Sequence, residues 1–330
     1  MLRKTLLITS IVLVIALAAT IVFAQAPQRG ERGQRGERGA APAAAPAGGA
    51  PQAQPQKIEQ IKPGLYVVTG AGGNSTVRVT KDGVILTDTK NLGDQFYNDL
   101  MAQIKTVTDK PVKYVIITHH HQDHSGNIGK FVQAGIPVIA NENLKTNLVT
   151  YAPAQGKPAP PSVTYRKDTT VKLGGVQAKV YHFGRGHTSG DSIVYYPDLK
   201  VVLGGDVVVG AVPNFDFPFG GSVVEGQKVL ASIAKLDFDT IVPGHSAPAP
   251  NKTTMTKAEF MAYKMKIDTL VARAKELIKS GTPKDQLIAK LKTDDLGWNI
   301  NVANWTAPAR LDPFYEELTT GKPAGPPKTE

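Results

Sequence analysis

The sequence predicts an α/β fold in which β-sheets are sandwiched between helices. Two observations support this prediction. Strand-like and helix-like segments mix throughout the chain from Ile58 onward, and consecutive β-hairpins occur at the start and in the middle of this region. Apolar residues make up 41% and charged residues 20% of the 330 residues, so most of the chain can bury a core.

The predicted strands are short apolar runs bounded by turns, several of which contain glycine. They are 64–68, 75–80, 84–88, 112–118, 137–140, 176–183, 192–196, 200–203 and 240–242. The predicted helices carry apolar residues three to four positions apart, which places these residues on one helix face. They are 92–105, 127–134, 225–236, 257–279 and 284–291. The turn from Gly70 to Ser75, between the first two strands, is a candidate flap.

The N-terminus has the pattern of a secretory signal. Arg3 and Lys4 precede an uncharged apolar run from Thr5 to Phe23, and the small residue Ala24 offers a cleavage site. We therefore predict a signal peptide over residues 1–24 and a periplasmic or secreted protein. The alternative interpretation is an uncleaved membrane anchor, because the run approaches the length that spans a bilayer.

Three further segments follow the predicted signal peptide. Residues 25–56 are rich in Ala, Pro, Gly and Arg, and this composition buries too little apolar surface to offset the entropy of ordering. We therefore predict a disordered linker there. A catalytic domain is predicted over residues 57–250, and a C-terminal helical extension packed on that domain over residues 251–330.

Composition narrows the chemistry that the protein can carry out. The net charge is +10; residues 1–56 carry six basic and two acidic residues and so contribute +4, which leaves +6 for the rest. No basic cluster is interleaved with aromatic residues, so we predict no nucleic-acid partner. The sequence has no cysteine, which excludes disulfides and thiolate ligands. Any metal is then held by histidine, aspartate or glutamate.

Four of the seven histidines lie in one segment, His119-His-His-Gln-Asp-His124. Alternate side chains of an extended segment share a face, so His119 and His121 can reach one position while His120 points away. Asp123 and His124 follow where the chain must turn, so they can face a second position nearby. The spacing His-x-His-x-Asp-His therefore predicts a metal site.

Three more candidates, His187, Asp206 and His245, each lie one to four residues past the end of a predicted strand. Side chains at the carboxyl ends of several strands gather at one rim of a sheet, and glycine in these turns lets the backbone approach a metal closely. A single His or Asp at a strand end is more often a turn residue than a ligand. Here, however, four strand ends carry such residues, counting the segment 119–124, and together they include five of the seven histidines. His120 and His182 stay outside the set, and packing or surface roles are predicted for them.

These motifs resemble the metallo-β-lactamase fold superfamily of metallo-hydrolases, in order along the chain as well as in type, over roughly Ile58 to Pro250. The resemblance implies an αββα sandwich with a dinuclear site between the sheets, and a zinc-dependent hydrolase. Asp88 is similar to the family's first acidic motif, which supports the site from behind the ligands. The resemblance also implies the ligands: His119, His121 and His187 for the first metal, Asp123, His124 and His245 for the second, and Asp206 as the bridging carboxylate.

Two Zn²⁺ ions suit this set of imidazoles and carboxylates, and iron or manganese is an alternative. Two metals that share a hydroxide lower its pKa, and we expect that hydroxide to attack a carbonyl or phosphoryl group. Asp123 is the candidate catalytic residue, because it can orient the nucleophile or carry a proton. Asp88 and Thr118 are candidates for fixing the tautomers of the imidazoles.

We predict that the substrate is a small molecule cleaved at an ester, thioester or amide-type bond. Phe215 and Phe217 follow Asp206 in a loop that either lines the substrate pocket or packs on the core. Hydrolysis of β-lactams is an alternative, which the lack of a cysteine ligand weakens. Asp206 makes the ligand set resemble that of the thioesterases and general hydrolases of the superfamily.

Two function classes other than a hydrolase remain open from the sequence. An iron-dependent oxidoreductase of sulfur or oxygen chemistry is compatible with nitrogen and oxygen ligands. A metal-binding protein without catalysis is the other, and the complete ligand set argues against it. A membrane partner is expected only if the N-terminal segment stays uncleaved, and the oligomeric state is left open.

Overall fold

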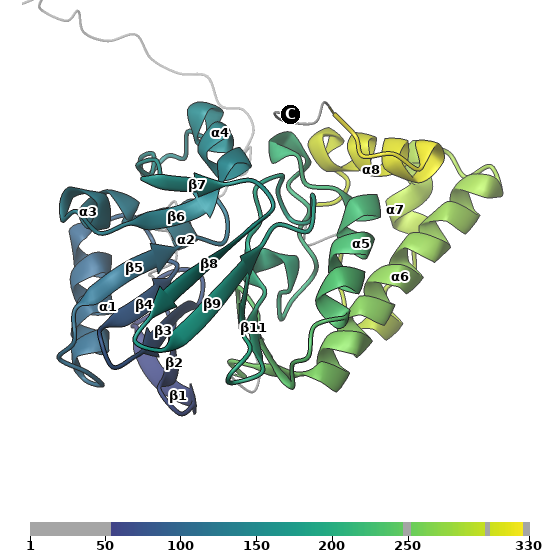
Figure 1. Ribbon diagram of the computed structural model, residues 1–330. Coiled ribbons are helices and arrows are strands. Elements are labelled where there is room, and N and C mark those ends of the chain that lie inside the picture. The colour runs from purple at the N-terminus through teal and green to yellow at the C-terminus, as the bar shows by residue number, and fades with distance from the viewer. Residues whose placement is uncertain (1–53, 247–251, 301–303, 326–330) are drawn as a thin grey trace, which may run out of the picture. The chain divides into compact units, whose positions relative to one another are not determined.

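The structure is a computed structural model that describes residues 54–246, 252–300 and 304–325 (Figure 1). By its contacts the chain divides into residues 1–50 and 51–330, and the fold reported below is that of the second unit. Its centre consists of two β-sheets, one of seven strands and one of six. The predicted signal peptide, 1–24, and the predicted linker up to residue 53 lie outside the described residues.

The seven-stranded sheet follows chain order from β1 to β7. Neighbours from β1 to β4 pair antiparallel, whereas neighbours from β4 to β7 pair parallel. Parallel neighbours need a crossover, and helices supply it between β4 and β5 and between β5 and β6. The strands are β1 (Lys57–Lys62), β2 (Leu65–Thr69), β3 (Ser75–Val79), β4 (Val84–Thr87), β5 (Val112–Ile116), β6 (Val138–Asn141) and β7 (Val163–Tyr165).

The six-stranded sheet has the order β13-β12-β11-β10-β9-β8. Only β11 and β12 pair parallel in it, and helix α5 connects these two strands. All its other neighbours pair antiparallel. The strands are β8 (Asp168–Leu173), β9 (Val176–Tyr181), β10 (Ile193–Tyr196), β11 (Val201–Leu203), β12 (Thr240–Val242) and β13 (Met255–Thr256).

Helices cover the outer face of each sheet, so the layers are αββα (Figure 1). Helices α1, α3 and α4 pack on the first sheet, and α5, α6 and α8 pack on the second. This arrangement confirms the predicted fold class. The helices are α1 (Asp94–Lys105), α2 (Gln122–Ser125), α3 (Ile128–Gln133), α4 (Glu142–Thr150), α5 (Val223–Ala234), α6 (Lys257–Lys279), α7 (Leu287–Lys290) and α8 (Pro308–Thr320).

The alternation of side chains along each strand explains how both faces of both sheets become buried. In β4, Ile85 belongs to the core between the sheets, whereas Val84 and Leu86 belong to the core under α1 and α3. Val194 of β10 likewise lies between the sheets, and Ile193 lies under the second helical layer. Buried on both sides, these strands read as continuous apolar runs in the sequence.

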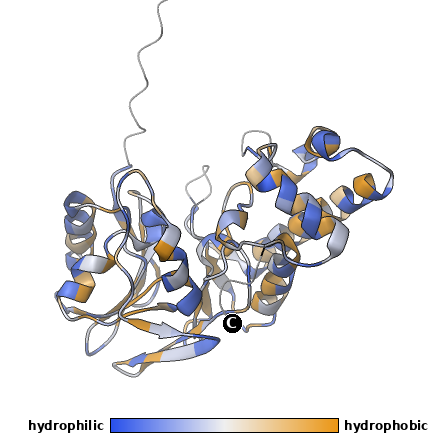
Figure 2. Ribbon diagram, turned by 90° about the horizontal axis from the view of Figure 1, so that it is seen from above, coloured by the Kyte–Doolittle hydropathy of each residue, from blue (hydrophilic) through white to orange (hydrophobic). Residues whose placement is uncertain are grey.

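The C-terminal helices continue the outer layer of the second sheet. Helix α6 has the bounds that its amphipathic pattern predicts, and a capping box between Thr256 and Glu259 fixes its start. Several helices, α6 among them, carry apolar and polar residues on different faces (Figure 2). Within the described ranges, no helix combines the length and apolarity needed to cross a membrane.

Some elements depart from the sequence pattern for identifiable reasons. Strand β8 has a single buried residue, Val171, so it lacks the apolar run that would predict a strand. Helix α8 contains Pro313 in its interior, a residue that normally ends a helix, and is therefore not predicted. Helix α4 has a weak apolar pattern and is recognisable only from its N-cap, Asn141. The predicted helix 284–291 is split into a 3-10 turn, Lys284–Gln286, and the short α7.

Candidate metal centre

Seven candidate ligands gather where the carboxyl ends of strands from both sheets meet. The first sheet supplies four of them after β5, on the connection and on the single-turn helix α2: His119, His121, Asp123 and His124. The second sheet supplies three, after β9, β11 and β12 respectively: His187, Asp206 and His245. The centre therefore lies between the two sheets, as the resemblance implies.

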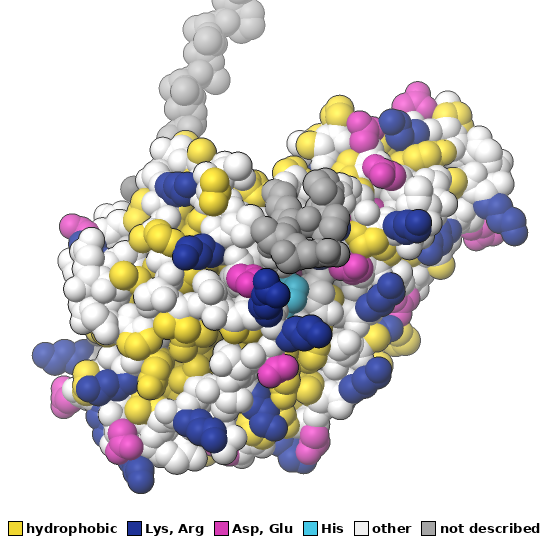
Figure 3. All heavy atoms as spheres, turned by 45° about the horizontal axis from the view of Figure 1, so that its top comes forward, with side chains coloured by type: hydrophobic (Ala, Val, Ile, Leu, Met, Phe, Trp, Pro, Cys, Tyr) yellow, Lys and Arg dark blue, Asp and Glu magenta, His cyan; other side chains and the backbone are white. Residues whose placement is uncertain are grey.

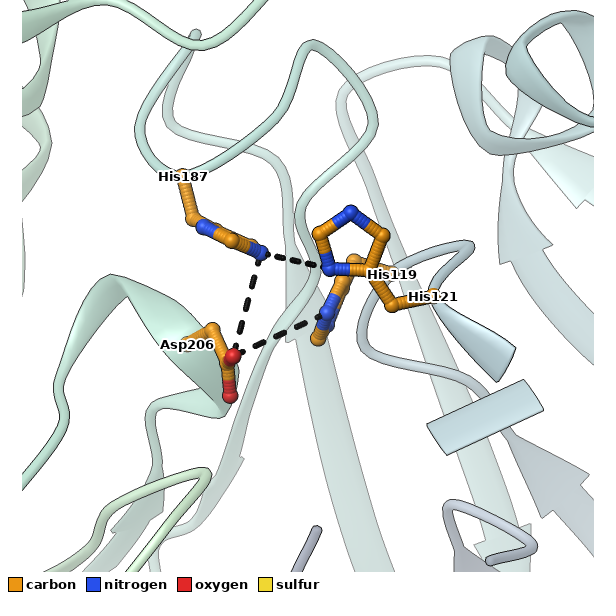
Figure 4. Close-up of side chains that lie close together, drawn as sticks. All are labelled: His119, His121, His187 and Asp206. Atoms are coloured by element: carbon orange, nitrogen blue, oxygen red, sulfur yellow. Dashed lines mark hydrogen bonds and ion pairs between the residues drawn. The ribbon is translucent and has the colours of Figure 1, made fainter. Parts of the chain in front are cut away.

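Three imidazoles and one carboxylate form the first group: His119, His121, His187 and Asp206 (Figure 4). One ligand atom from each lies within 4.8 Å of all the others. The Nε2 atom of His187 is 3.0 Å from Nδ1 of His121 and 3.8 Å from Oδ2 of Asp206. Four ligands placed tetrahedrally about 2.1 Å from one ion stand about 3.4 Å apart. The spacing of the first group fits that arrangement.

Hydrogen bonds to the far side of two rings fix which nitrogens face the centre. His187 donates from Nδ1 to the carbonyl oxygen of Asn214 at 2.6 Å, so its Nε2 carries a lone pair. His121 has its Nε2 2.7 Å from Oδ2 of Asp216, so its Nδ1 carries the lone pair when the ring is neutral. Two lone pairs then face each other across 3.0 Å. They repel unless a cation lies between them.

Asp123, His124 and His245 form the second group, whose ligand atoms also lie within 4.8 Å of one another. Oδ2 of Asp123 is 3.1 Å from Nε2 of His245 and 3.6 Å from Nε2 of His124. His124 donates from Nδ1 to Oδ2 of Asp88 at 2.8 Å, which directs its Nε2 into the group. The side chain of His245 is 40% exposed, so the second group is the more open of the two.

The carboxylate of Asp206 lies between the two groups. Its Oδ1 is 3.2 Å from Nε2 of His124, and its Oδ2 is 3.5 Å from Nε2 of His245. The same Oδ2 is 4.0 Å from Nε2 of His119 in the first group. One carboxylate can thus contact ions in both positions, which is the arrangement of a bridging ligand.

The surroundings of the two groups favour bound cations. Nε2 of His119 is buried and has no hydrogen-bond partner among the described residues, so a metal would satisfy it. Two glycines leave room for the ligands. A Cβ on Gly73 would lie 2.1 Å from the His124 ring, and one on Gly244 would lie 2.0 Å from Oδ1 of Asp206. The residues present therefore fit one metal ion in each group.

The electrostatics of the two groups differ. Burial, followed by the charge of His124, lowers the pKa of His119 well below its ordinary value. Burial and His121 lower the pKa of His187 to about 4, so both rings are neutral ligands at pH 7. Burial also opposes charge at His245, but Asp206 and Asp123 outweigh it and raise that pKa to about 9. The second group therefore attracts positive charge.

The order and spacing of these ligands match a known protein family. A family model for the Metallo-beta-lactamase superfamily matches residues 68–245, which is more than half of the chain. The chain belongs to the metallo-beta-lactamase superfamily. It is accordingly a metal-dependent hydrolase, which confirms the family and enzyme class predicted from the sequence.

Curated relatives of this metallo-beta-lactamase superfamily protein include two enzymes of moderate similarity. "Metallo-beta-lactamase IND-1" of Chryseobacterium indologenes is 31% identical over 175 residues, which cover 52% of this chain and 71% of the relative. "Metallo-beta-lactamase type 2" of Elizabethkingia meningoseptica is 28% identical over 160 residues, or 46% of this chain. The chain spans 62% of the length of that relative.

Solved structures show the same fold at lower identity. A metallo-beta-lactamase from Pontibacter korlensis aligns with a TM-score of 0.55 and 22% identity, covering 64% of this chain and 99% of the other. The inverting sec-alkylsulfatase Pisa1 from Pseudomonas sp. aligns with a TM-score of 0.58 and 18% identity. That alignment covers 72% of this chain and 45% of the sulfatase.

In this superfamily member, Asp88 lies behind the ligands of both groups. Its Oδ1 accepts from the backbone N–H of Thr118 at 2.8 Å, and its Oδ2 accepts from the Thr118 hydroxyl at 2.7 Å. That hydroxyl lies 3.1 Å from Nδ1 of His119, and the same Oδ2 contacts His124. One carboxylate thus orients one ring of each group. Asp88 has a φ of 62°, a strained conformation for a non-glycine residue that is often found at functional sites.

The turn from Gly70 to Ser75, a candidate flap, lies against the second group. Gly73 donates to the carbonyl oxygen of Asp123 at 3.1 Å, and Asn74 donates to that of Gly244 at 2.7 Å. The buried Nζ of Lys90 donates to the carbonyl oxygens of Val68 and Gly73 at 2.5 and 2.7 Å. These bonds hold the turn in place beside the ligands.

Sequence reasoning missed Asp216, which contacts His121. Burial opposes its ionisation, but the hydrogen bond and charge of His121 lower the pKa of Asp216 below its ordinary value. It therefore acts as a charged acceptor that orients the ring. The sequence shows only an acidic residue within an aromatic stretch. Because Asp216 is 95 positions from His121, the contact between them cannot be predicted from the sequence.

The two aromatic residues predicted near the pocket are placed toward the core. Phe215 is 7% exposed and contacts Trp305 with ring centroids 6.2 Å apart. It borders a cavity of about 10 Å³ beside His187 and Asp206, which is room for one water molecule rather than a substrate. Phe217 is partly buried and packs on the same core. For Phe215 the structure therefore supports the packing alternative.

The two histidines left outside the predicted set are also outside the two groups. The ring of His120 is fully buried and packs against Tyr151 and Phe219 at centroid distances of 4.8 and 4.6 Å. The Nδ1 atom of His182 donates to the carbonyl oxygen of Asp191 at 2.8 Å. Histidine contributes little to the molecular surface: on the face turned forward in Figure 3, histidine side chains are exposed at a single spot, which lies beside acidic and basic side chains.

Proposed function

We propose that this chain is an exported hydrolase that uses two zinc ions to cleave an ester, thioester or amide-type bond of a small molecule. The observation that supports the proposal most directly is the position of Asp206, whose carboxylate faces both groups of imidazoles. Imidazole and carboxylate ligands with no thiolate suit zinc. Two zinc ions held there would lower the pKa of a water molecule and polarise the bond under attack.

The residues around the centre divide the remaining tasks. Asp88, Asp216 and the Asn214 carbonyl fix the tautomers of the rings, which keeps lone pairs directed inward. Asp123 is the candidate catalytic residue. Burial opposes its ionisation, but the charge of His124 and the hydrogen bond and charge of His245 hold the pKa of Asp123 well below its usual range. A carboxylate of such low pKa is a poor proton carrier, so we assign it the role of orienting the nucleophile.

Hydrolysis of β-lactams is the second candidate function. The curated relatives named metallo-beta-lactamases, at 28% and 31% identity, favour it. The ligand set argues against it, because Asp206 stands at the shared position and the chain contains no cysteine. We therefore rank this activity below ester and thioester hydrolysis.

Metal analysis and a substrate panel test the proposal together. Purified protein should contain two zinc ions per chain and hydrolyse chromogenic esters or thioesters, and His119→Ala with His121→Ala should abolish both properties. Turnover of a chromogenic cephalosporin alone would select the second candidate instead. Iron as the dominant metal, or wild-type zinc content in the double variant, would refute the hydrolase mechanism proposed here.

Export is supported by the sequence pattern of residues 1–24, which lie outside the described residues. The mature protein should be recovered outside the cytoplasm with Gln25 as its first residue. Recovery of full-length protein in the membrane fraction would instead support the uncleaved anchor. Recovery of the full-length chain in the cytosol would contradict export altogether.

A further inference from the structure

The loop that orients two ligands of the first group is residues 214–222, here called the orienting loop. Its first part supplies the Asn214 carbonyl oxygen to His187 and the Asp216 carboxylate to His121. The backbone of Asp216 also donates to the carbonyl oxygen of His187 at 2.8 Å. Displacement of this loop would therefore move two of the three imidazoles of the first group.

The start of the orienting loop is held by helix α8 of the C-terminal extension. Nη1 of Arg310 donates to Oδ1 of Asn214 at 2.7 Å. One side chain of α8 thus holds the residue whose carbonyl oxygen orients His187.

The end of the orienting loop is held by the same helix. Glu317 is fully buried, and its Oε2 accepts from the Ser222 hydroxyl at 3.0 Å and from the N–H groups of Val223 and Val224 at 2.7 and 3.1 Å. These N–H groups belong to the first turn of α5, where a carboxylate is stabilised by the helix dipole. Oε1 of Glu317 accepts from Ala324, which closes the C-terminal segment onto the helix.

The two anchors share one face of α8. Arg310 and Glu317 are seven positions apart, which is about two turns or 10 Å along a helix. Between them, Phe314 packs on Trp305 at a centroid distance of 5.1 Å, and Trp305 packs on Phe215 of the loop. The helix therefore contacts the orienting loop at both ends and, through Trp305, also supports Phe215 near the start of the loop.

We propose that Arg310 is a positioning residue for the metal centre, and that α8 thereby sets the affinity of the first group for its metal. The inference rests on the metal centre of the proposed function, but not on the identity of the substrate. Removing the guanidinium should free the side chain of Asn214, and with it the start of the loop that orients His187 and His121. Lost outer support of a metal ligand typically lowers metal affinity about 10–100-fold.

Zinc affinity measured against a competing chromophoric chelator tests this role. Arg310→Met should lower one of the two stepwise zinc-binding constants, the one that belongs to the first group, about 10–100-fold. The same loss should appear in a His245→Ala background, which removes a ligand of the second group and leaves the first group complete. Arg310→Lys, which can still reach Asn214, should restore part of the affinity. Asn214→Ala should add little to the loss of affinity caused by Arg310→Met, because both variants remove the same hydrogen bond, that between Arg310 and Asn214.

Lys284→Met is the matched control, because Lys284 also pairs with a residue of α8, Asp312, at 2.7 Å but does not contact the orienting loop. Its zinc constants should equal those of the wild type. Equal constants in Arg310→Met and the wild type would overturn the inference, as would an equal loss in both methionine variants. Failure of the wild-type protein to bind zinc would instead refute the proposed function, so the two failures are distinguishable.

Discussion

A single methyl group at Gly244 should dismantle the metal centre. A Cβ added there would lie 2.0 Å from Oδ1 of Asp206, 2.6 Å from the carbonyl carbon of Gly205 and 2.8 Å from the backbone nitrogen of Asp206. Contacts under 3.0 Å essentially do not occur, so the carboxylate must move by at least about 1 Å. Metal–ligand distances tolerate only about 0.2 Å. Because Asp206 faces both groups, Gly244→Ala should impair both metal positions.

We expect Gly244→Ala to lose metal and to lower kcat/KM at least about 100-fold, since it displaces a ligand rather than a residue behind it. Overpacking against the Gly205 and Asp206 backbone should also cost about 1–3 kcal/mol of folding free energy. Metal content by elemental analysis and urea unfolding measure the two effects. Gly129→Ala is the control, because its Cβ would meet only Ala159 Cβ, at 3.3 Å. A Gly244→Ala protein with the full metal complement and unchanged turnover would show that the Asp206 geometry is wrong.

Two further predictions concern stability. Burial lowers the pKa of Lys90 to about 7 despite the charges of Asp88 and Asp123. The unfolded state then binds a proton that the folded state lacks between pH 7 and 10.5, so stability should rise with pH in that window, by up to about 5 kcal/mol. Urea unfolding of the metal-loaded protein should show this rise in the wild type but not in Lys90→Met, and parallel pH profiles would contradict it. Phe314→Ala should destabilise the fold by about 3–5 kcal/mol in a single transition, because Phe314 is fully buried, whereas Met265→Ala, at a position 60% exposed, should have little effect. A separate early transition for the C-terminal helices would count against a shared core.

The parts of the fold that the sequence predicts are those whose determinants are local. Helix α6 is predicted with its bounds because the capping box and the amphipathic spacing lie within its own residues. The central strands are predicted because burial on both faces gives continuous apolar runs. Helix α8 is not predicted, since packing of Phe314 on Trp305 outweighs the local effect of Pro313, and such packing is invisible in the sequence.

The candidate centre divides in the same way. The seven proposed ligands are found from spacing and strand ends, because their arrangement follows from strand alternation and from the rim of a sheet. Asp216, Asn214 and Arg310 are not found, because each acts on a residue far away in the chain. For Phe215 the sequence leaves two alternatives open, a pocket wall or core packing. The sequence cannot choose between them, because the packing of its ring on Trp305, 90 positions away in the chain, is visible only in the fold.

The division of ligands between the sheets has a consequence for how the site forms. His119 and His121 come from the end of the first sheet, and His187 and Asp206 come from the second, so neither sheet carries a complete set. An ion bound there would cross-link the two sheets. The affinity for the metal should therefore depend on the distance and angle at which the apolar faces of the two sheets pack. A substitution in the core between the sheets that shifts one sheet should weaken metal binding even though every ligand is retained.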